Sequence, residues 1–302
     1  MATQSGPTGR RPMCPTCSKP TRLCLCTRFK MPKLKNSVSV TVLQHSLEKN
    51  HPLNSTRIAS IALQNLTVIP VSDVNFQARF SIRPLHSSDL EPSEIPVVFT
   101  VEKYGKIKSF RVTGNGSPPE CDLDQLLASR NGVVDDLDKG FVVKKFQMKE
   151  FNGSTGFEER AEFEITVPQG SVLLFPSEKS VGIEEGMMRR CEVKNLIVLD
   201  GTWAKAKRMY RENPWLELLP HVELVEEEGR RKQSLYGEVR LQPKEGCLST
   251  IESIVCGLKA VGERDLEGLD GVLQVFASMV GDQRRCKEER LQALAMPSLS
   301  QP

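Results

Sequence analysis

The chain has 302 residues, of which 39% are apolar and 26% are charged, a composition typical of a globular protein with one large or two modest domains. It contains no run of about 18 apolar residues and no apolar stretch near its first residue. We therefore expect neither a membrane-spanning segment nor a secretory signal, no membrane as a partner, and a cytoplasmic or nuclear location.

Positive charge is concentrated in the first part of the sequence, although the formal net charge is only +3. The first acidic residue is Glu48, and eight cations precede it: Arg10, Arg11, Lys19, Arg22, Arg28, Lys30, Lys33 and Lys35. A segment of this kind is typical of proteins that bind phosphate-rich partners. A solvated basic tail is the alternative interpretation.

Four of the nine cysteines form a tight cluster, CPTCSKPTRLCLC, within this basic segment. Without a secretory signal, a metal site is a better interpretation than a disulfide scaffold. Two close cysteine pairs joined by a short loop can converge on one tetrahedral ion, and zinc binds thiolates well. The spacing predicts a structural zinc site, with a redox pair or chance clustering as the alternative. The expected ligands are Cys14, Cys17, Cys24 and Cys26.

Residues 37–71 predict a strand, a helix and a second strand. The segment SVSVTVLQH, 37–45, alternates and is rich in Val, which is typical of a strand. Asn54 or Ser55 can cap the helix that follows. Arg57 in the first turn is a candidate phosphate contact, and a plain cap with an exposed Arg is the alternative. LTVIPV, 66–71, predicts the second strand.

Residues 72–165 differ in character and predict an inserted β-rich segment, with a hairpin around Tyr104 and Gly105. After this segment, apolar strands alternate with helices again. The expected strands are 171–175, 195–200 and, more weakly, 237–242, and the expected helices are 248–262 and about 270–292. This alternation predicts an α/β fold with a mainly parallel sheet and helices on both faces. In such sheets, ligands bind at the carboxyl ends of the strands.

The stretch LIVLDGTWAKAKRMY, 196–210, ends a buried strand on the carboxylate of Asp200. Gly201 permits a sharp turn, and Thr202 can cap the next helix. That helix carries an aromatic ring and a series of cations: Trp203, Lys205, Lys207 and Arg208. A base, an aromatic ring and cations are what chemistry on a nucleobase requires. The alternative is that Asp200 caps the helix and Trp203 belongs to the core.

A second helix start has a similar double interpretation. Ser249 and Glu252, spaced by two residues before an apolar run, match a capping box. The same helix N-terminus could also bind an anionic or polar group of a ligand.

Asp200-Gly201-Thr202-Trp203 resembles the Asp-x-Thr-Trp signature of the DTW-domain family. Four further features fit this family in its order: the cysteine cluster, the turn Asn54-Ser55-Thr56-Arg57, and the segments LLFPSE and LSTIES. They lie within residues 14–71 and 171–262. Residues 72–165 depart from the compact bacterial pattern of the family.

The resemblance implies a tRNA-uridine aminocarboxypropyltransferase with a SPOUT-like knotted core. Such an enzyme moves the 3-amino-3-carboxypropyl group of S-adenosylmethionine to N3 of a uridine in tRNA and releases methylthioadenosine. Asp200 would remove the N3 proton, with Thr202 and Trp203 beside it. The implied contacts to S-adenosylmethionine are Leu174, Pro176, Ser177, Leu199, Leu248, Ser249, Thr250 and Glu252. The implied contacts to tRNA are Arg57, Lys205, Lys207 and Arg208.

This interpretation divides the chain into a basic segment with the cysteine cluster, 1–36, a catalytic domain, 37–292, and a tail, 293–302. The insertion at 72–165 would interrupt the catalytic domain and help to place the tRNA. Two other function classes are a SPOUT-type RNA methyltransferase with the same cofactor and a non-catalytic, zinc-containing RNA-binding module. Ribosomal RNA is an alternative substrate.

Overall fold

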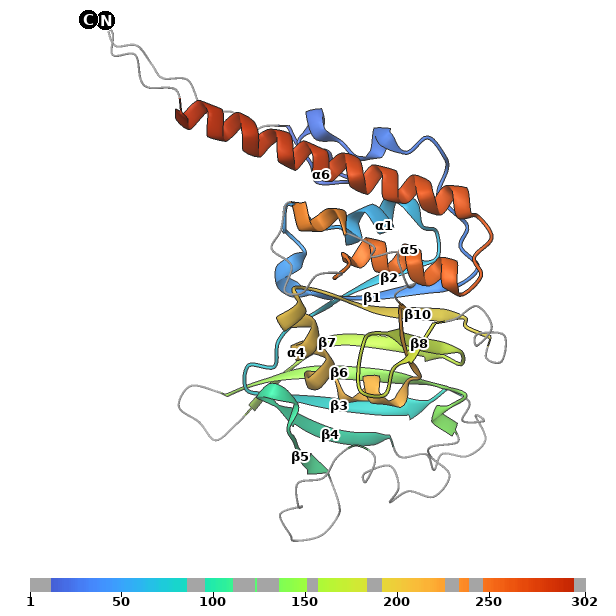
Figure 1. The fold of residues 1–302 in the computed structure, drawn as a ribbon. Coiled ribbons are helices and arrows are strands. Elements are labelled where there is room, and N and C mark those ends of the chain that lie inside the picture. The colour runs from blue at the N-terminus through green and yellow to red at the C-terminus, as the bar shows by residue number, and fades with distance from the viewer. Residues whose placement is uncertain are drawn as a thin grey trace, which may run out of the picture.

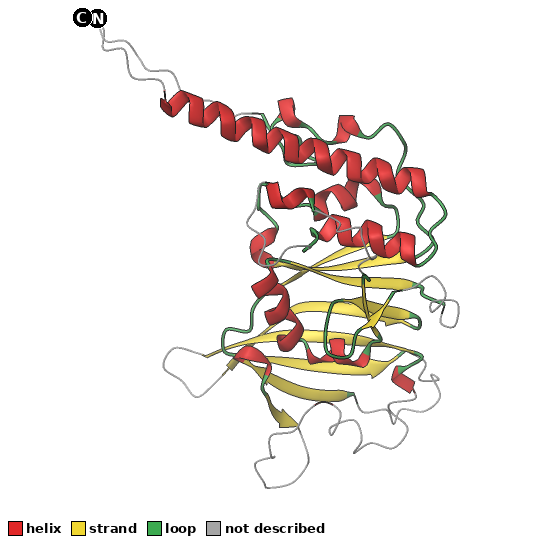
Figure 2. Cartoon of the chain, viewed as in Figure 1, coloured by secondary structure: helices red, strands yellow, loops and turns green. Residues whose placement is uncertain are grey.

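Two β-sheets of different type lie beneath a layer of helices (Figures 1 and 2). The computed structural model describes residues 12–85, 96–110, 123, 136–150, 157–183, 192–225, 234–238 and 247–295. In this part of the chain, no helix combines the length and the apolar character needed to cross a membrane.

The first sheet is parallel throughout, which confirms the prediction of a mainly parallel sheet. Its six strands follow the order β2 (Leu66–Val71), β1 (Ser39–His45), β10 (Asn195–Asp200), β8 (Ser171–Leu174), β11 (His221–Glu223) and β9 (Val181–Gly182). The central strands are short apolar runs because both faces of the sheet are covered. The prediction missed β9 and β11, which are too short to give a periodic signal.

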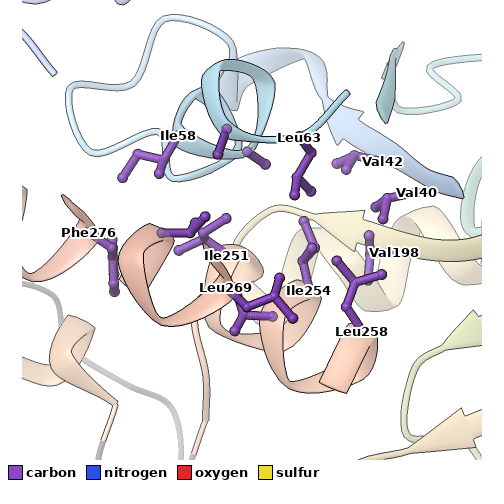
Figure 3. Packing of buried hydrophobic residues seen from close by; sticks show 14 of the residues in the cluster. Val40, Val42, Ile58, Leu63, Val198, Ile251, Ile254, Leu258, Leu269 and Phe276 are labelled. Atoms are coloured by element: carbon purple, nitrogen blue, oxygen red, sulfur yellow. The ribbon is translucent and has the colours of Figure 1, made fainter. Parts of the chain in front are cut away.

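Helices cover one face of the parallel sheet (Figure 1). They are α1 (Thr56–Ala62) and α5 (Thr250–Ala260), which lie next to the sheet, and α6 (Leu266–Ala295), which packs over α1 and α5. Because side chains alternate between the two faces of a strand, Val40, Val42 and Val198 all point to this layer. There they pack with Ile254 and Phe276, among other apolar residues of the helices (Figure 3). This buried core therefore packs β1, from the N-terminal part of the chain, against the C-terminal helices α5 and α6.

The opposite face packs against a second sheet and one helix, so the prediction of helices on both faces is not confirmed. The second sheet is antiparallel, in the order β5 (Ile107–Phe110), β4 (Val97–Glu102), β3 (Gln77–Pro84), β6 (Gly140–Glu150) and β7 (Phe157–Pro168). The helix is α4 (Trp203–Glu212). The core between the two sheets contains Leu43, Leu173 and Ile197 of the parallel sheet, packed with Phe80 and Trp215. The apolar face of a sheet can cover another sheet as a helix does, and the β-rich segment serves that purpose here.

Short 3-10 helices connect several elements: Thr21–Leu23, Cys26–Arg28, Ser46–Glu48, Lys103–Gly105, Pro214–Leu218 and Leu235–Glu238. The predicted hairpin around Tyr104 and Gly105 is confirmed, since β4 and β5 pair antiparallel across that turn. The predicted strand 237–242 is wrong at its first two residues, which belong to a 3-10 helix, and 239–242 lie outside the described residues. Helix α6 is longer than expected at both ends and continues into the segment assigned to the tail. The knotted core stays a prediction.

Candidate active site and metal centre

Asp200, the last residue of β10, lies at the carboxyl edge of the parallel sheet and is 6% exposed. It stands in register with Gln44 of the neighbouring strand β1. The Gln44 amide nitrogen Nε2 donates to Asp200 Oδ2 at 2.8 Å, and the Thr250 hydroxyl donates to Asp200 Oδ1 at 2.6 Å. Two donors from β1 and α5 therefore hold one buried carboxylate.

Helix α5 begins with the predicted capping box. Ser249 Oγ accepts from the backbone N–H of Glu252, and Glu252 accepts from the backbone N–H of Ser249. Glu252 also accepts from Ser234 Oγ at 2.6 Å and from the Leu235 backbone N–H at 3.0 Å. These bonds fix the start of α5 and so place Thr250 beside Asp200. Leu248, directly before the cap, is half-buried.

The turn after Asp200 is tight. A Cβ atom at Gly201 would lie 3.1 Å from the Cβ of Lys205 and 3.5 Å from the Cβ of His45. Thr202 caps α4, because its hydroxyl accepts from the Lys205 backbone N–H at 3.4 Å. Thr202 is therefore the cap of α4. The alternative interpretation, in which Asp200 caps this helix, does not hold, because Asp200 faces α5.

Trp203 is flanked by two neighbours. Its ring centroid lies 5.7 Å from that of Phe175, and the Lys207 ammonium lies 5.5 Å above the indole. Phe175 in turn stacks on Tyr210 at 5.0 Å. Trp203 is half-buried and packs at the edge of the core shared by the two sheets. The indole therefore has a core side and a side covered by a cation.

Ser177, just beyond β8, is bonded to a buried histidine. Ser177 Oγ lies 2.6 Å from His221 Nδ1, and His221 Nε2 lies 2.9 Å from the Leu216 carbonyl oxygen. A carbonyl only accepts, so Nε2 carries a proton, and in the neutral imidazole Nδ1 then accepts from the Ser177 hydroxyl. Pro176 is exposed beside it. Burial raises the pKa of the nearby Tyr210 phenol.

The apolar residues expected around S-adenosylmethionine divide between the two faces of the sheet. Leu174 is buried in the core beneath the helices. Leu199 is half-buried and packs against the core on the other side.

The four cations expected to contact tRNA differ in their surroundings. Lys207 is exposed. Arg57 donates from Nη2 to the Lys49 carbonyl at 3.0 Å, and Lys205 pairs with the buried Glu48 at 3.0 Å. Arg208 contacts two carboxylates and one carbonyl oxygen, of Asp73, Glu212 and Val74. The Arg208 guanidinium thus joins α4 to the connection between β2 and β3.

The four clustered cysteines converge, as their spacing predicted. Their sulfur atoms all lie within 4.8 Å of one another. The Cys14–Cys26 sulfur distance is 3.9 Å and the Cys17–Cys24 distance is 3.7 Å. A tetrahedral zinc with bonds of about 2.3 Å separates its sulfur ligands by roughly 3.8 Å. The geometry therefore fits a zinc site with four thiolate ligands.

Proton affinities within the cluster are uneven. Hydrogen bonds from Cys17 lower the pKa of the Cys14 thiol to about 6, whereas burial raises the pKa of Cys26 to about 12. The Leu25 backbone N–H also donates to Cys17 Sγ at 3.5 Å. Such N–H groups are typical of the surroundings that orient metal ligands.

Two cations attach the cluster to the rest of the fold. Arg28 donates to the Cys24 carbonyl at 3.1 Å and to Ser278 and Asp282 of α6. The buried Lys19 donates to the Pro52 carbonyl, two residues before Asn54. The basic segment is therefore part of the fold from residue 12 onward, while Arg10 and Arg11 lie outside the described residues.

The predicted strand 37–45 ends with Gln44 and His45, and the sequence indicated no role for Gln44. The structure brings Gln44 to Asp200 and brings His45 to Asp73, at 3.1 Å on the opposite face of the sheet. His221 was also missed. A signal for Gln44 exists, because two apolar strands that end at the same sheet edge place their last polar side chains together.

Comparisons with known proteins agree on one family. A family model described as "DTW domain" matches residues 11–284. The chain is 40% identical over 83 residues, 28% of its length, to tRNA-uridine aminocarboxypropyltransferase 2 of Drosophila melanogaster. It is 22% identical over 252 residues, 82% of its length, to tRNA-uridine aminocarboxypropyltransferase 2 of Mus musculus, and 33% identical over 61 residues, 20% of its length, to tRNA-uridine aminocarboxypropyltransferase A of Arabidopsis thaliana.

These matches cover only part of each relative. The chain spans 31% of the Drosophila protein, 56% of the mouse protein and 23% of the Arabidopsis protein. No solved structure matches the chain significantly.

Proposed function

The chain belongs to the DTW-domain family, and on this basis we propose that it is a tRNA-uridine aminocarboxypropyltransferase. The proposed reaction transfers the 3-amino-3-carboxypropyl group of S-adenosylmethionine to N3 of a uridine in tRNA and releases methylthioadenosine. The names of the relatives support modification of tRNA uridines. The proposed location is the cytoplasm or the nucleus, where tRNA substrates are found.

The observation that carries this proposal is the Asp200 carboxylate held at the carboxyl edge of the parallel sheet. An ionised carboxylate offers about four acceptor positions, and Gln44 and Thr250 occupy two of them. The remaining capacity suits an N–H donor such as N3 of uridine. A neutral uridine N3 is a poor nucleophile, so a positioned base that takes its proton aids attack on carbon.

The residues near this carboxylate fit S-adenosylmethionine as the co-substrate. The start of α5 presents backbone N–H groups, which suit a carboxylate group, and Leu248 offers an apolar surface beside them. S-adenosylmethionine, when bound, supplies a carbon activated by its bond to a sulfonium. In the proposed reaction the N3–carbon bond forms, the carbon–sulfur bond breaks with its electrons passing to sulfur, and Asp200 accepts the N3 proton.

The aromatic and basic residues would complete the site. Trp203 would form a wall beside the reacting groups, and Pro176 and Ser177 would line the cofactor side. Ser177 is held in place, because its Oγ accepts from the Lys179 backbone N–H at 3.2 Å and contacts His221. Lys207 is the cation best placed to reach RNA phosphate, since it is exposed. Zinc bound by the four cysteines would be structural, because all four tetrahedral positions are filled by protein sulfur atoms.

Mass spectrometry of nucleosides tests the proposal. Purified protein is incubated with S-adenosylmethionine and unmodified tRNA, alongside Asp200→Asn. We expect a uridine that gains an aminocarboxypropyl group, and we expect its loss in the variant. The variant must be checked for folding, because the Asn amide would place a donor near Gln44 or Thr250.

Two other outcomes separate the rival functions. Gain of a methyl group would assign the protein to the methyltransferases. Binding of tRNA without any product, by folded and zinc-loaded protein, would indicate an RNA-binding module. A parallel incubation with ribosomal RNA tests that alternative substrate.

A further inference from the structure

We propose that Gln44 is a positioning residue for the Asp200 carboxylate and that Asn54 fixes the orientation of the Gln44 amide. The inference rests on the proposed function, in which Asp200 is the proton acceptor. Hydrogen bonds from Gln44 to Asn54 and to Asp200 connect the ends of the parallel strands β1 and β10 with the start of α1.

The orientation of the Asn54 amide follows from its partners. The Arg57 backbone N–H donates to Asn54 Oδ1 at 3.2 Å. Asn54 Nδ2 lies 3.1 Å from the Glu48 carbonyl oxygen and 3.2 Å from the Lys49 carbonyl oxygen. A backbone N–H only donates and a carbonyl only accepts, so the oxygen and nitrogen of Asn54 cannot be exchanged.

The fixed Asn54 in turn orients Gln44. Gln44 Nε2 lies 3.4 Å from Asn54 Oδ1 and 2.8 Å from Asp200 Oδ2. Both neighbours are acceptors, so the two hydrogens of the Gln44 amide are directed at them. A flipped amide would place its oxygen against two oxygens. Gln44 therefore presents a donor to Asp200 whether or not a substrate is bound.

This arrangement sets the plane of the Asp200 carboxylate. Gln44 donates to Oδ2 from β1, and Thr250 donates to Oδ1 from α5. Each oxygen has one protein donor, so rotation of the group breaks a bond on both sides. Gln44 is 6% exposed, and water cannot easily replace its amide. A base held in one orientation reaches the transition state with less reorganisation.

Gln44→Met tests the donor directly, because Met has a similar length and no N–H group. We expect kcat for transfer to fall about tenfold to a hundredfold, the usual effect of losing a hydrogen bond to a charged group, with little change in KM for tRNA. The matched control is Gln77→Met. Gln77 donates to Glu102 at 3.3 Å in the second sheet, away from Asp200, and its variant should keep the wild-type rate.

Gln44→Glu supplies a readout that a merely structural role would not change. The carboxyl group introduced by this substitution can donate to Asp200 only while the pair holds a proton. As the pH rises, both groups ionise and repel each other, so activity should decline with pH in this variant and not in the wild-type protein. A wild-type kcat in Gln44→Met, or a pH profile of Gln44→Glu that matches the wild type, would overturn the inference.

A double-mutant cycle on unfolding separates this inference from the proposed function. Gln44→Met and Asp200→Asn are measured singly and together by urea unfolding, which needs no enzymatic activity. Non-additive effects are expected, and additive effects would contradict the contact even if the wild-type enzyme is active. Absence of product with wild-type protein would instead refute the proposed function.

Discussion

Arg28 of the cysteine-rich segment binds Asp282 of α6 through an ion pair of 2.5 Å, although the two residues are 254 positions apart in the sequence. The Asp282 side chain is 9% exposed, so water competes little for this contact. Arg28 also donates to Ser278 on the same helix and to the Cys24 carbonyl. One side chain thus joins the predicted zinc site to α6, the last helix of the fold.

Arg28→Met should loosen this attachment. We expect the free energy of unfolding to fall by about 1–3 kcal/mol, since partly buried hydrogen bonds to charged groups are lost, and proteolysis of the cysteine-rich segment to become faster. Thermal melting and limited proteolysis provide the measurements. Arg285→Met is the control, because Arg285 also pairs with Asp282 but is 62% exposed and should contribute little. Equal effects of the two variants would contradict the anchoring role of Arg28.

The cysteine geometry leads to a prediction on metal content. We expect the purified protein to hold one zinc ion per chain, as the four converging sulfur atoms suggest. Cys17→Ser should lose that ion, and it should melt at a lower temperature because the segment is held by the metal. Elemental analysis measures the zinc. Cys286→Ser is the matched control, since Cys286 is half-buried on α6 and does not belong to the cluster; zinc loss there would argue against a specific site at the four clustered cysteines.

A buried lysine in the second sheet predicts a pH effect on stability. Lys145 is 0% exposed and contacts the Glu162 carboxylate and the Ser72 carbonyl, each at 3.1 Å. Burial lowers the pKa of its ammonium below the ordinary 10.5. Between the folded and unfolded pKa values, the unfolded chain binds more protons. The free energy of unfolding therefore rises with pH across that window.

Lys145→Met should remove this rise and destabilise the protein by roughly 3 kcal/mol, because Glu162 loses its cation. Urea unfolding between neutral pH and pH values just below 10.5 measures both effects. Lys144→Met is the control. Lys144 is the next residue, 40% exposed and paired with Glu164, so its variant should keep the wild-type slope. A wild-type slope in Lys145→Met would show that Lys145 does not cause the pH dependence.

Local signals in the sequence predicted the parts of the site that depend on neighbours along the chain. The apolar run before Asp200 ends where β10 ends, and Ser249 and Glu252 form the capping box that their spacing indicates. The cysteine spacing likewise predicted the convergence of four sulfur atoms. Each of these features depends on residues that are close together in the sequence.

Contacts between distant segments were not predictable in the same way. Gln44 meets Asp200 across 156 positions, and Thr250 meets it across 50, because of the strand order and the packing of α5. A single sequence does not reveal which strands are neighbours. For the same reason, the sequence did not predict what covers the second face of the parallel sheet. Leu43 and Ile197 pack there against the antiparallel sheet and α4, and not against a second layer of helices.

The environments of Lys207 and Arg208 lead to opposite expectations for two adjacent cations. Lys207 is exposed, whereas Arg208 is bonded to Asp73 and to Glu212, whose side chain is 1% exposed. Each phosphate contact contributes about one unit to the slope of log affinity against log salt for a nucleic acid. Lys207→Gln should therefore weaken tRNA binding and reduce this slope by about one, and lower the free energy of unfolding by at most about 1 kcal/mol through loss of the contact with Trp203.

Arg208→Gln should instead lower the free energy of unfolding by roughly 3 kcal/mol, because it leaves a buried carboxylate without its cation, and should leave the salt slope unchanged. Filter binding of tRNA at several salt concentrations, together with urea unfolding, distinguishes the two effects. If the slope falls in Arg208→Gln and not in Lys207→Gln, the guanidinium leaves its internal partners to bind RNA. The contact between α4 and the connection from β2 to β3 would then change when tRNA binds.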